Sequence, residues 1–76
     1  MSTLEKIVAD VLGVAEEEID DETGTATAAS WNSLRHVQII AAVGREYGLR
    51  ITPRRARSCR SVGDLRKLLA EEGRSA

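Results

Sequence analysis

The segment SLRHVQIIAAVGREYG, residues 33–48, decides the fold, because apolar residues recur through it at helical spacing. The helix should begin near Ser33, with Ser30 or Asn32 available as N-cap, and Gly48 should end it. Its expected apolar face is wide and consists of Leu34, Val37, Ile40, Ala41 and Tyr47, with Ile39 and Val43 beside them. We expect this helix to lie at the centre of the fold.

Residues 3–12 predict a second amphipathic helix, because their apolar side chains also follow a helical spacing. These side chains belong to Leu4, Ile7, Val8, Val11 and Leu12. Ser2 and Glu5 form a capping-box pattern at its start, and Gly13 suits the left-handed residue that follows a helix.

The C-terminal part of the chain predicts one short helix and one longer helix. Pro53 is well placed to open a short helical turn over the RRARS segment, since its fixed φ suits a first helical position. Ser61 and Asp64 form another capping-box pattern, and the helix after them should end near Glu72, ahead of Gly73. Its core stripe is expected to consist of Val62, Leu65, Leu68 and Leu69.

Residues 14–31 show no sustained helical period and predict a long loop, which Ile19 should pin to the core. Loops of this length in compact domains tend to be functional. No stretch alternates as a strand would. The sequence therefore predicts an all-α fold, a small four-helix bundle of three main helices and one short helix. We expect one domain over residues 1–76, with residues 73–76 as a frayed tail.

The composition is that of a small soluble domain, with 42% hydrophobic and 30% charged residues among 76. A single Cys cannot form an internal disulfide, and one Cys with one His cannot complete a structural zinc site. No apolar run reaches the roughly 18 residues of a membrane span, and the N-terminal stretch lacks the pattern of a signal peptide. We expect a cytoplasmic monomer with no metal site and no membrane contact.

The net charge of -1 hides a strong asymmetry along the chain. Residues 1–32 carry one basic and eight acidic side chains, whereas residues 33–76 carry ten basic and four acidic ones. The Arg-rich residues 50–60 raise the alternative of nucleic-acid binding. The acidic overall balance and the lack of aromatic residues for stacking argue against it. We expect the charges to guide protein partners instead.

Most catalytic motifs are missing, including a Gly-rich phosphate loop, a framed pair of carboxylates and metal-ligand spacing. Ser33 and His36 lie at i and i+3 on one helical face, which suggests a nucleophile and its base. No third group or oxyanion hole is evident to orient this pair. We therefore expect that the protein is not an enzyme.

The order of residues from Ser33 onward is more informative than the composition. Its features are Ser33-Leu34, the aliphatic Val37, Ile39 and Val43, the aromatic Tyr47, then Leu49, Ile51, Pro53 and Ser-Val-x-Asp-Leu from Ser61. This order, without a gap as far as Leu69, resembles the acyl carrier protein family and its peptidyl carrier relatives. Residues 20–30 depart from the family pattern, which has an apolar residue followed by Leu-Gly there.

The resemblance implies that Ser33 receives 4′-phosphopantetheine from coenzyme A, because the family's Asp-Ser-Leu signature corresponds here to Asn32-Ser33-Leu34. A serine at a helix N-terminus suits this role, since the helix dipole favours the phosphodiester. Trp31 and His36 further resemble a subset of discrete carriers in secondary-metabolite pathways. The implied function is an acyl or aminoacyl carrier that holds a thioester for polyketide, nonribosomal peptide or related biosynthesis.

The implied partners are a phosphopantetheinyl transferase, a loading ligase or acyltransferase, and downstream synthase or tailoring enzymes. Family members usually present acidic residues on the second and third helices, whereas this chain places basic or neutral ones there. The residues expected to bind partners are Arg35, Gln38, Arg54, Arg55 and Arg57. We expect dedicated partners with acidic or apolar docking surfaces, because like charges that face each other weaken binding.

Several alternatives stay open at this point. Asn32 in place of Asp and the altered loop also fit an interaction module of the same fold that is no longer phosphopantetheinylated. Trp31 should anchor the loop in the core near the first helix rather than line the path of the arm. Cys59 is expected to be a buried structural thiol. Gly63 has no explanation from the sequence, since glycine costs stability inside a helix.

Overall fold

The structure is a computed structural model, which describes residues 3–74. Within that range the chain forms four α-helices and one 3-10 turn, which confirms the predicted all-α bundle with three main helices and one short helix. The elements are α1 (Thr3–Leu12), η1 (Glu16–Glu18), α2 (Ser33–Tyr47), α3 (Pro53–Ser58) and α4 (Val62–Glu71). Ser2 of the first capping-box pattern and residues 75–76 of the expected tail lie outside the described residues. No described helix is both long and apolar enough to cross a lipid bilayer.

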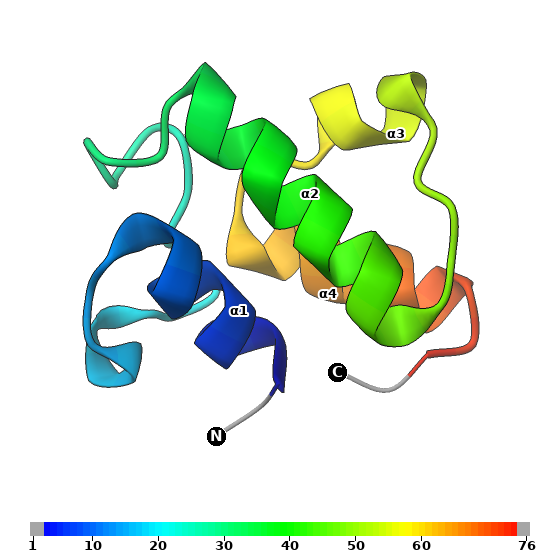
Figure 1. The fold of residues 1–76 in the computed structure, drawn as a ribbon, viewed down its shortest axis with the longest axis horizontal. Helices are drawn as coiled ribbons and strands as arrows, with labels where there is room; N and C mark the ends of the chain where they lie inside the picture. The colour runs from blue at the N-terminus through cyan, green and yellow to red at the C-terminus, as the bar shows by residue number, and fades with distance from the viewer. Residues whose placement is uncertain (1–2, 75–76) are drawn as a thin grey trace.

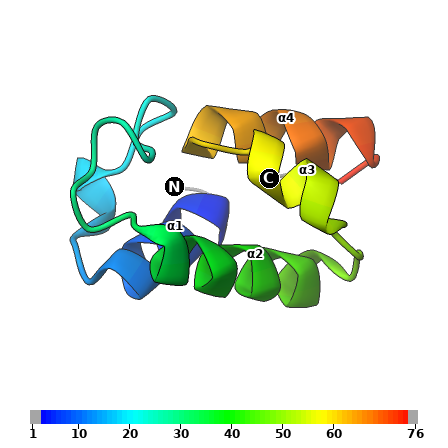
Figure 2. The ribbon, with the colours of Figure 1, turned by 90° about the horizontal axis from the view of Figure 1, so that it is seen from above.

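The helices enclose one apolar core, with α2 and α4 on opposite sides of it. Figure 1 shows α2 running diagonally across the front of the molecule, with α4 behind it. In the view from above, α3 lies between α2 and α4, while α1 lies beside α2 toward its other end (Figure 2). α1 packs against both α2 and α4. The long loop between α1 and α2 covers the side of the bundle that α3 leaves open.

Side-chain caps set the start of three helices. Asn32 Oδ1 accepts from Arg35 N over 3.0 Å at the start of α2. Thr52 Oγ1 accepts from Arg55 N over 3.3 Å at the start of α3, and Ser61 Oγ accepts from Asp64 N over 3.2 Å at the start of α4. Asp64 Oδ2 accepts from Arg60 N over 3.0 Å, so its carboxylate does not close the predicted capping box on Ser61. Gly48 ends α2 with a φ of 63°, as predicted. Beyond α4, Arg74 Nε donates to Tyr47 O over 3.0 Å.

The core consists of aliphatic residues from the helices and three residues from outside them. The buried hydrophobic residues are Leu4, Val8, Ala9, Leu12, Ile19, Trp31, Ile39, Val43, Cys59, Val62, Leu65, Leu68 and Leu69. All four predicted core residues of α4 are among them, and Ile19 pins the loop as expected. Burial raises the pKa of the Cys59 thiol, and the nearby Asp64 carboxylate adds to the rise. This agrees with the expected structural role of Cys59, because a protonated thiol is a poor nucleophile.

The predicted apolar face of α2 is wrong for three residues, Leu34, Val37 and Ala41, which are exposed. Leu34 and Val37 each keep 65% of their surface accessible. The buried face of α2 is centred on Ile39 and Val43. Leu34 and Val37 lie five and two positions before Ile39, and Ala41 lies two positions before Val43. With 3.6 residues per turn, these spacings place them on the opposite side of the helix. The sequence pattern thus contains two apolar stripes, of which the core uses one.

The loop is held against the start of α4 by backbone hydrogen bonds. Thr25 N donates to Arg60 O over 2.9 Å, and Val62 N donates to Thr23 O over 2.9 Å. Gly24 and Ser61 form an isolated antiparallel bridge between these bonds. The predicted loop therefore has a fixed structure that its polar sequence did not indicate, including the short turn η1.

Two glycines allow the close approach of the loop and α4. A Cβ on Gly24 would lie 2.1 Å from Arg60 O, and a Cβ on Gly63 would lie 3.0 Å from Asp21 O. Gly63 N also donates to Asp21 O over 2.9 Å. The structure thereby explains Gly63, because a larger residue there would push the loop off the helix.

The first prediction concerns this contact. Gly24→Ala should lower the free energy of unfolding by about 1–3 kcal/mol, because the backbone must shift to admit the methyl group. Urea unfolding followed through the fluorescence of Trp31, the one Trp of the chain, measures the change. Ala26→Ser on the exposed part of the loop is the control and should cost less than about 0.5 kcal/mol. Equal stability of Gly24→Ala and the wild type would contradict the tight packing of this loop.

Candidate functional site

Ser33 is the first residue of α2 and is exposed to solvent. Its neighbour Asn32 adopts extended backbone and caps the helix, so Ser33 lies where the first amide groups of the helix point outward. The aligned peptide dipoles make this end of a helix positive, which favours an anion. The arrangement thus offers an accessible hydroxyl at a place where a phosphodiester would be stabilised.

His36 connects the loop, α2 and α3 through both of its ring nitrogens. Trp31 Nε1, which can only donate, lies 3.0 Å from His36 Nδ1, so Nδ1 is the unprotonated nitrogen. His36 Nε2 lies 2.7 Å from Ala56 O and therefore carries the proton that it donates to this carbonyl. We call this chain of two hydrogen bonds the Trp31–His36–Ala56 chain.

The Trp31–His36–Ala56 chain bears on two questions from the sequence, whether His36 acts as a base for Ser33 and whether Trp31 anchors the loop. Both nitrogens of His36 are occupied by other partners, so the imidazole does not serve as a base for Ser33 in this structure. Trp31 is only 3% exposed and belongs to the core, as the anchoring interpretation predicts, and it also forms part of the wall of the groove beside Ser33. Its anchor includes a hydrogen bond to α2, which the sequence pattern did not reveal.

A groove lies beside Ser33, between the loop, the start of α2 and the end of α3. Its volume is about 480 Å³, and its lining consists of Thr25, Trp31, Asn32, Ser33, His36, Val37, Arg57, Cys59 and Arg60. The structure thus brings together the predicted site residues Trp31, Asn32, Ser33 and His36, while Leu34 points elsewhere on α2 and is not part of the lining. Sequence reasoning missed Thr25 and Arg60 as members of this site, because only the packing of the loop on α4 brings them there.

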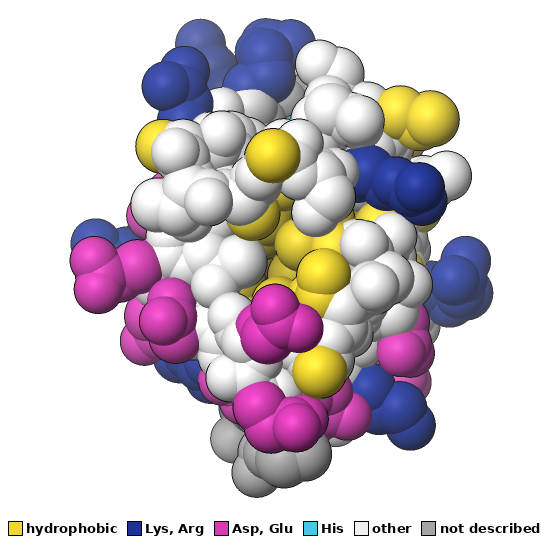
Figure 3. All heavy atoms as spheres, turned by 90° about the vertical axis from the view of Figure 1, so that its left-hand side faces the viewer, with side chains coloured by type: hydrophobic (Ala, Val, Ile, Leu, Met, Phe, Trp, Pro, Cys, Tyr) yellow, Lys and Arg dark blue, Asp and Glu magenta, His cyan; other side chains and the backbone are white. Residues whose placement is uncertain are grey.

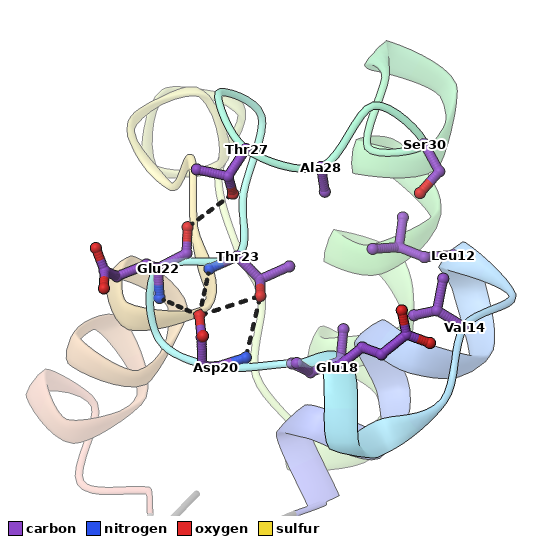
Figure 4. Close-up of a pocket in the computed structure, with 10 residues that line it drawn as sticks. Leu12, Val14, Glu18, Asp20, Glu22, Thr23, Thr27, Ala28 and Ser30 are labelled. Atoms are coloured by element: carbon purple, nitrogen blue, oxygen red, sulfur yellow. Dashed lines mark hydrogen bonds between the residues drawn. The ribbon is translucent and has the colours of Figure 1, made fainter.

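A second hollow lies under the loop, between the end of α1, η1 and residues 20–30, with a volume of about 450 Å³ (Figure 4). Its floor is apolar, with Leu12, Val14, Ile19 and Ala28, and its rim carries Glu18, Asp20 and Glu22. On the face that contains the loop, hydrophobic atoms show at the bottom of a depression with acidic side chains below it (Figure 3). Figure 4 shows the Asp20 carboxylate turned toward the loop backbone.

The carboxylate of Asp20 has a structural role in this second hollow. Asp20 Oδ1 accepts hydrogen bonds from Glu22 N over 2.9 Å and from Thr23 N over 3.0 Å. Thr27 Oγ1 in turn donates to Glu22 O over 3.0 Å. These bonds hold the loop in a tight turn, so Asp20 is committed to the fold.

The basic residues expected to bind partners differ in their surroundings. Arg55 forms ion pairs with Glu71 at 2.6 Å and Glu72 at 3.0 Å, which join α3 to the end of α4. Within residues 3–74, the exposed side chains of Arg54 and Arg57 form no ion pair. The positive charge that α3 presents to solvent therefore comes mainly from Arg54 and Arg57.

Arg35 and Gln38 lie on the exposed side of α2 near the apolar stripe. Arg35 Nη1 donates to Val11 O over 3.2 Å and approaches Gln38 Oε1 at 3.4 Å. The guanidinium thus bridges α2 to the last turn of α1, where carbonyl groups favour a cation. Leu34 and Val37, both exposed, lie on the same helix and form a small apolar surface next to Ser33.

The second prediction tests the Trp31–His36–Ala56 chain. Trp31→Phe should lower the free energy of unfolding, in part because less apolar area is buried. Because His36 Nδ1 also loses its hydrogen-bond donor, the variant should lose about 1 kcal/mol more than the smaller apolar area accounts for. A double-mutant cycle with His36→Phe, followed by circular dichroism in urea, isolates this coupling. Additive effects of the two changes would show that the hydrogen bond contributes nothing to stability.

Comparison with known families places these residues in a wider context. The model of the PP-binding family, described as the phosphopantetheine attachment site, matches residues 2–69. Among the curated proteins, none matches the chain significantly. The matched region covers most of the chain and includes the start of α2, with the groove beside it. The chain therefore belongs to the phosphopantetheine attachment site family, the carrier domains of acyl and peptidyl type to which 4′-phosphopantetheine is covalently attached.

Proposed function

We propose that Ser33 carries 4′-phosphopantetheine and that the protein is a discrete acyl or aminoacyl carrier, not an enzyme, in polyketide, nonribosomal peptide or related secondary-metabolite biosynthesis. The observation that carries this proposal is the position of Ser33, exposed at the first residue of α2 behind the Asn32 cap. When bound, the cofactor supplies a thiol on a flexible arm that holds the acyl group as a thioester. The protein supplies display and recognition.

The surroundings of Ser33 fit a phosphodiester. The helix N-terminus favours negative charge, and no acidic side chain is among the residues that line the adjacent groove. Asn32 keeps the capping hydrogen bond of the family's Asp without its charge. The Trp31–His36–Ala56 chain supports the start of α2, because it joins the residues before and after Ser33 to α3.

The exposed surface around Ser33 supports partners of a particular kind. Leu34 and Val37 offer apolar contacts on α2, and Arg54 and Arg57 offer positive charge on α3. A transferase, a loading ligase or acyltransferase and a downstream synthase or tailoring enzyme must each reach Ser33. Acidic or apolar docking surfaces on these enzymes would complement this side of the carrier.

One feature supports a second candidate, an interaction module of the same fold that carries no cofactor. Asn32 stands where the family has Asp, and the change removes a charge that a transferase can recognise. The exposed position of Ser33 at the start of α2 supports attachment instead. Modification of Ser33 separates the two candidates.

The third prediction is that incubation with coenzyme A and a broad-specificity phosphopantetheinyl transferase adds the mass of one phosphopantetheine. Intact-mass spectrometry measures the gain. Ser33→Ala should gain nothing, although it keeps the Asn32 cap and the helix. Ser30→Ala, three residues earlier in the loop, is the matched control and should be modified like the wild type.

Asn32→Asp restores the family signature. It tests whether Asn32 prevents the transferase from recognising an otherwise competent carrier. A gain in the wild type or in Asn32→Asp, absent from the corresponding Ser33→Ala variants, supports the carrier role. No gain in any of them would contradict it and would favour the interaction module.

The fourth prediction concerns docking. Arg54→Glu should slow acyl transfer to the cognate enzyme by about 3–10-fold at low salt, with a smaller effect at high salt, because long-range attraction is screened. Stopped transfer reactions analysed by mass spectrometry give the rates. Lys6→Glu on α1 makes the same charge change away from α3 and should leave the rate near that of the wild type. Arg55 is left intact, since its ion pairs hold α3 to α4. Equal rates for both variants would rule out α3 as a docking surface.

A further inference from the structure

The two hollows on either side of the loop have opposite charge. The hollow under the loop carries Glu18, Asp20 and Glu22 on its rim and no basic residue. The groove beside Ser33 carries Arg57 and Arg60 and no acidic residue. Of these two hollows, the groove that contains the attachment residue therefore attracts an anion, and the hollow under the loop repels it.

We propose that the groove beside Ser33 binds the acyl group on the arm when that group is short and carries an anion, such as a second carboxylate. This inference rests on the proposed function, since it places the acyl group on Ser33. It names a class of cargo, an acidic acyl thioester, that the attachment site alone does not specify.

The shape of the groove suits such a cargo. Ser33 is part of the wall, so a flexible arm that folds back brings its far end to the same groove. Trp31, Val37 and Cys59 provide apolar wall, and Trp31 and Cys59 are each only 3% exposed and thus fixed in the core. A short carbon chain can lie along this wall while its anionic end reaches the arginines at the edge.

Arg57 and Arg60 are available to bind an anion. Within residues 3–74, neither side chain forms an ion pair, and both residues are exposed. Asp64 accepts a hydrogen bond from the backbone N of Arg60 and does not line the groove. The planar guanidinium of each arginine suits a carboxylate, which can accept two parallel hydrogen bonds from it.

Asn32 removes the group that would oppose an anion at this place. It lines the groove, and its side chain caps α2 by accepting from Arg35 N over 3.0 Å. An Asp would cap the helix equally well but would add a negative charge to the groove wall. The neutral residue therefore keeps the structure and removes the repulsion.

The fifth prediction compares two loaded forms. Succinyl and butyryl arms, attached from the corresponding coenzyme A thioesters by a broad-specificity transferase, each have four carbons and differ by a carboxylate in place of a methyl group. The succinyl form should melt about 2–5 °C higher than the butyryl form in low salt, because only its carboxylate contacts the arginines. Intact mass confirms loading before each melting curve.

Three variants locate the effect. Arg57→Gln should remove most of the difference in melting temperature between the succinyl and butyryl forms. Asn32→Asp should reduce this difference while the helix cap remains. Arg54→Gln, on the same helix but outside the groove, should keep it and controls for overall charge. Loss of the difference in Arg54→Gln to the same degree as in Arg57→Gln would overturn the proposal.

The remaining outcomes are also decisive. If neither arm adds mass to the wild type or to Asn32→Asp, the carrier function and the cargo site are overturned together. Equal melting of the succinyl and butyryl forms of the loaded wild type overturns the cargo site alone. If Arg57→Gln lowers the melting temperature of the protein with an unacylated arm as much as that of the succinyl form, the arginines bind the phosphodiester and not the cargo. That result also overturns the cargo site.

Discussion

The hydrogen bonds of His36 are the constraint on which the functional end of the molecule depends. The imidazole accepts from Trp31 Nε1 at 3.0 Å and donates to Ala56 O at 2.7 Å, so one neutral side chain joins the loop, α2 and α3. These three elements also form the walls of the groove beside Ser33. A loop without the family's usual Leu-Gly element thereby keeps a fixed position at the attachment residue, since a buried Trp and its hydrogen bond hold it to α2.

Charge separation is the second organising feature, and it follows from the order of the sequence. Eight of the 12 acidic residues fall in residues 1–32, and three of them, Glu18, Asp20 and Glu22, lie on the rim of the hollow under the loop. Arg57 of α3 and Arg60 just beyond its end lie on the opposite side of the loop, at the groove. Ser33 lies on the basic side. A phosphodiester, an anionic cargo and an acidic docking surface are therefore all favoured in the same place.

Local patterns predicted most of the fold, while contacts between distant segments were not predictable from them. Helix bounds, the Asn32 and Ser61 caps and the burial of Ile19 and Cys59 follow from spacing and residue type, and the structure confirms them. The exposure of Leu34 and Val37 was missed, because periodicity alone does not tell which of two apolar stripes faces the core. Arg60 at the groove and the tight glycine at position 24 depend on how the loop packs on α4, which no local signal encodes.

The central claim is that Ser33, and no other hydroxyl of this exposed region, carries the cofactor. Fragmentation mass spectrometry of the protein, purified from cells that express a phosphopantetheinyl transferase and then digested, tests it most directly. The account predicts that the fragment ions place the whole added mass on Ser33 in the peptide that also contains Ser30. Modification of Ser30, of another serine, or of none in the presence of an active transferase would contradict the account.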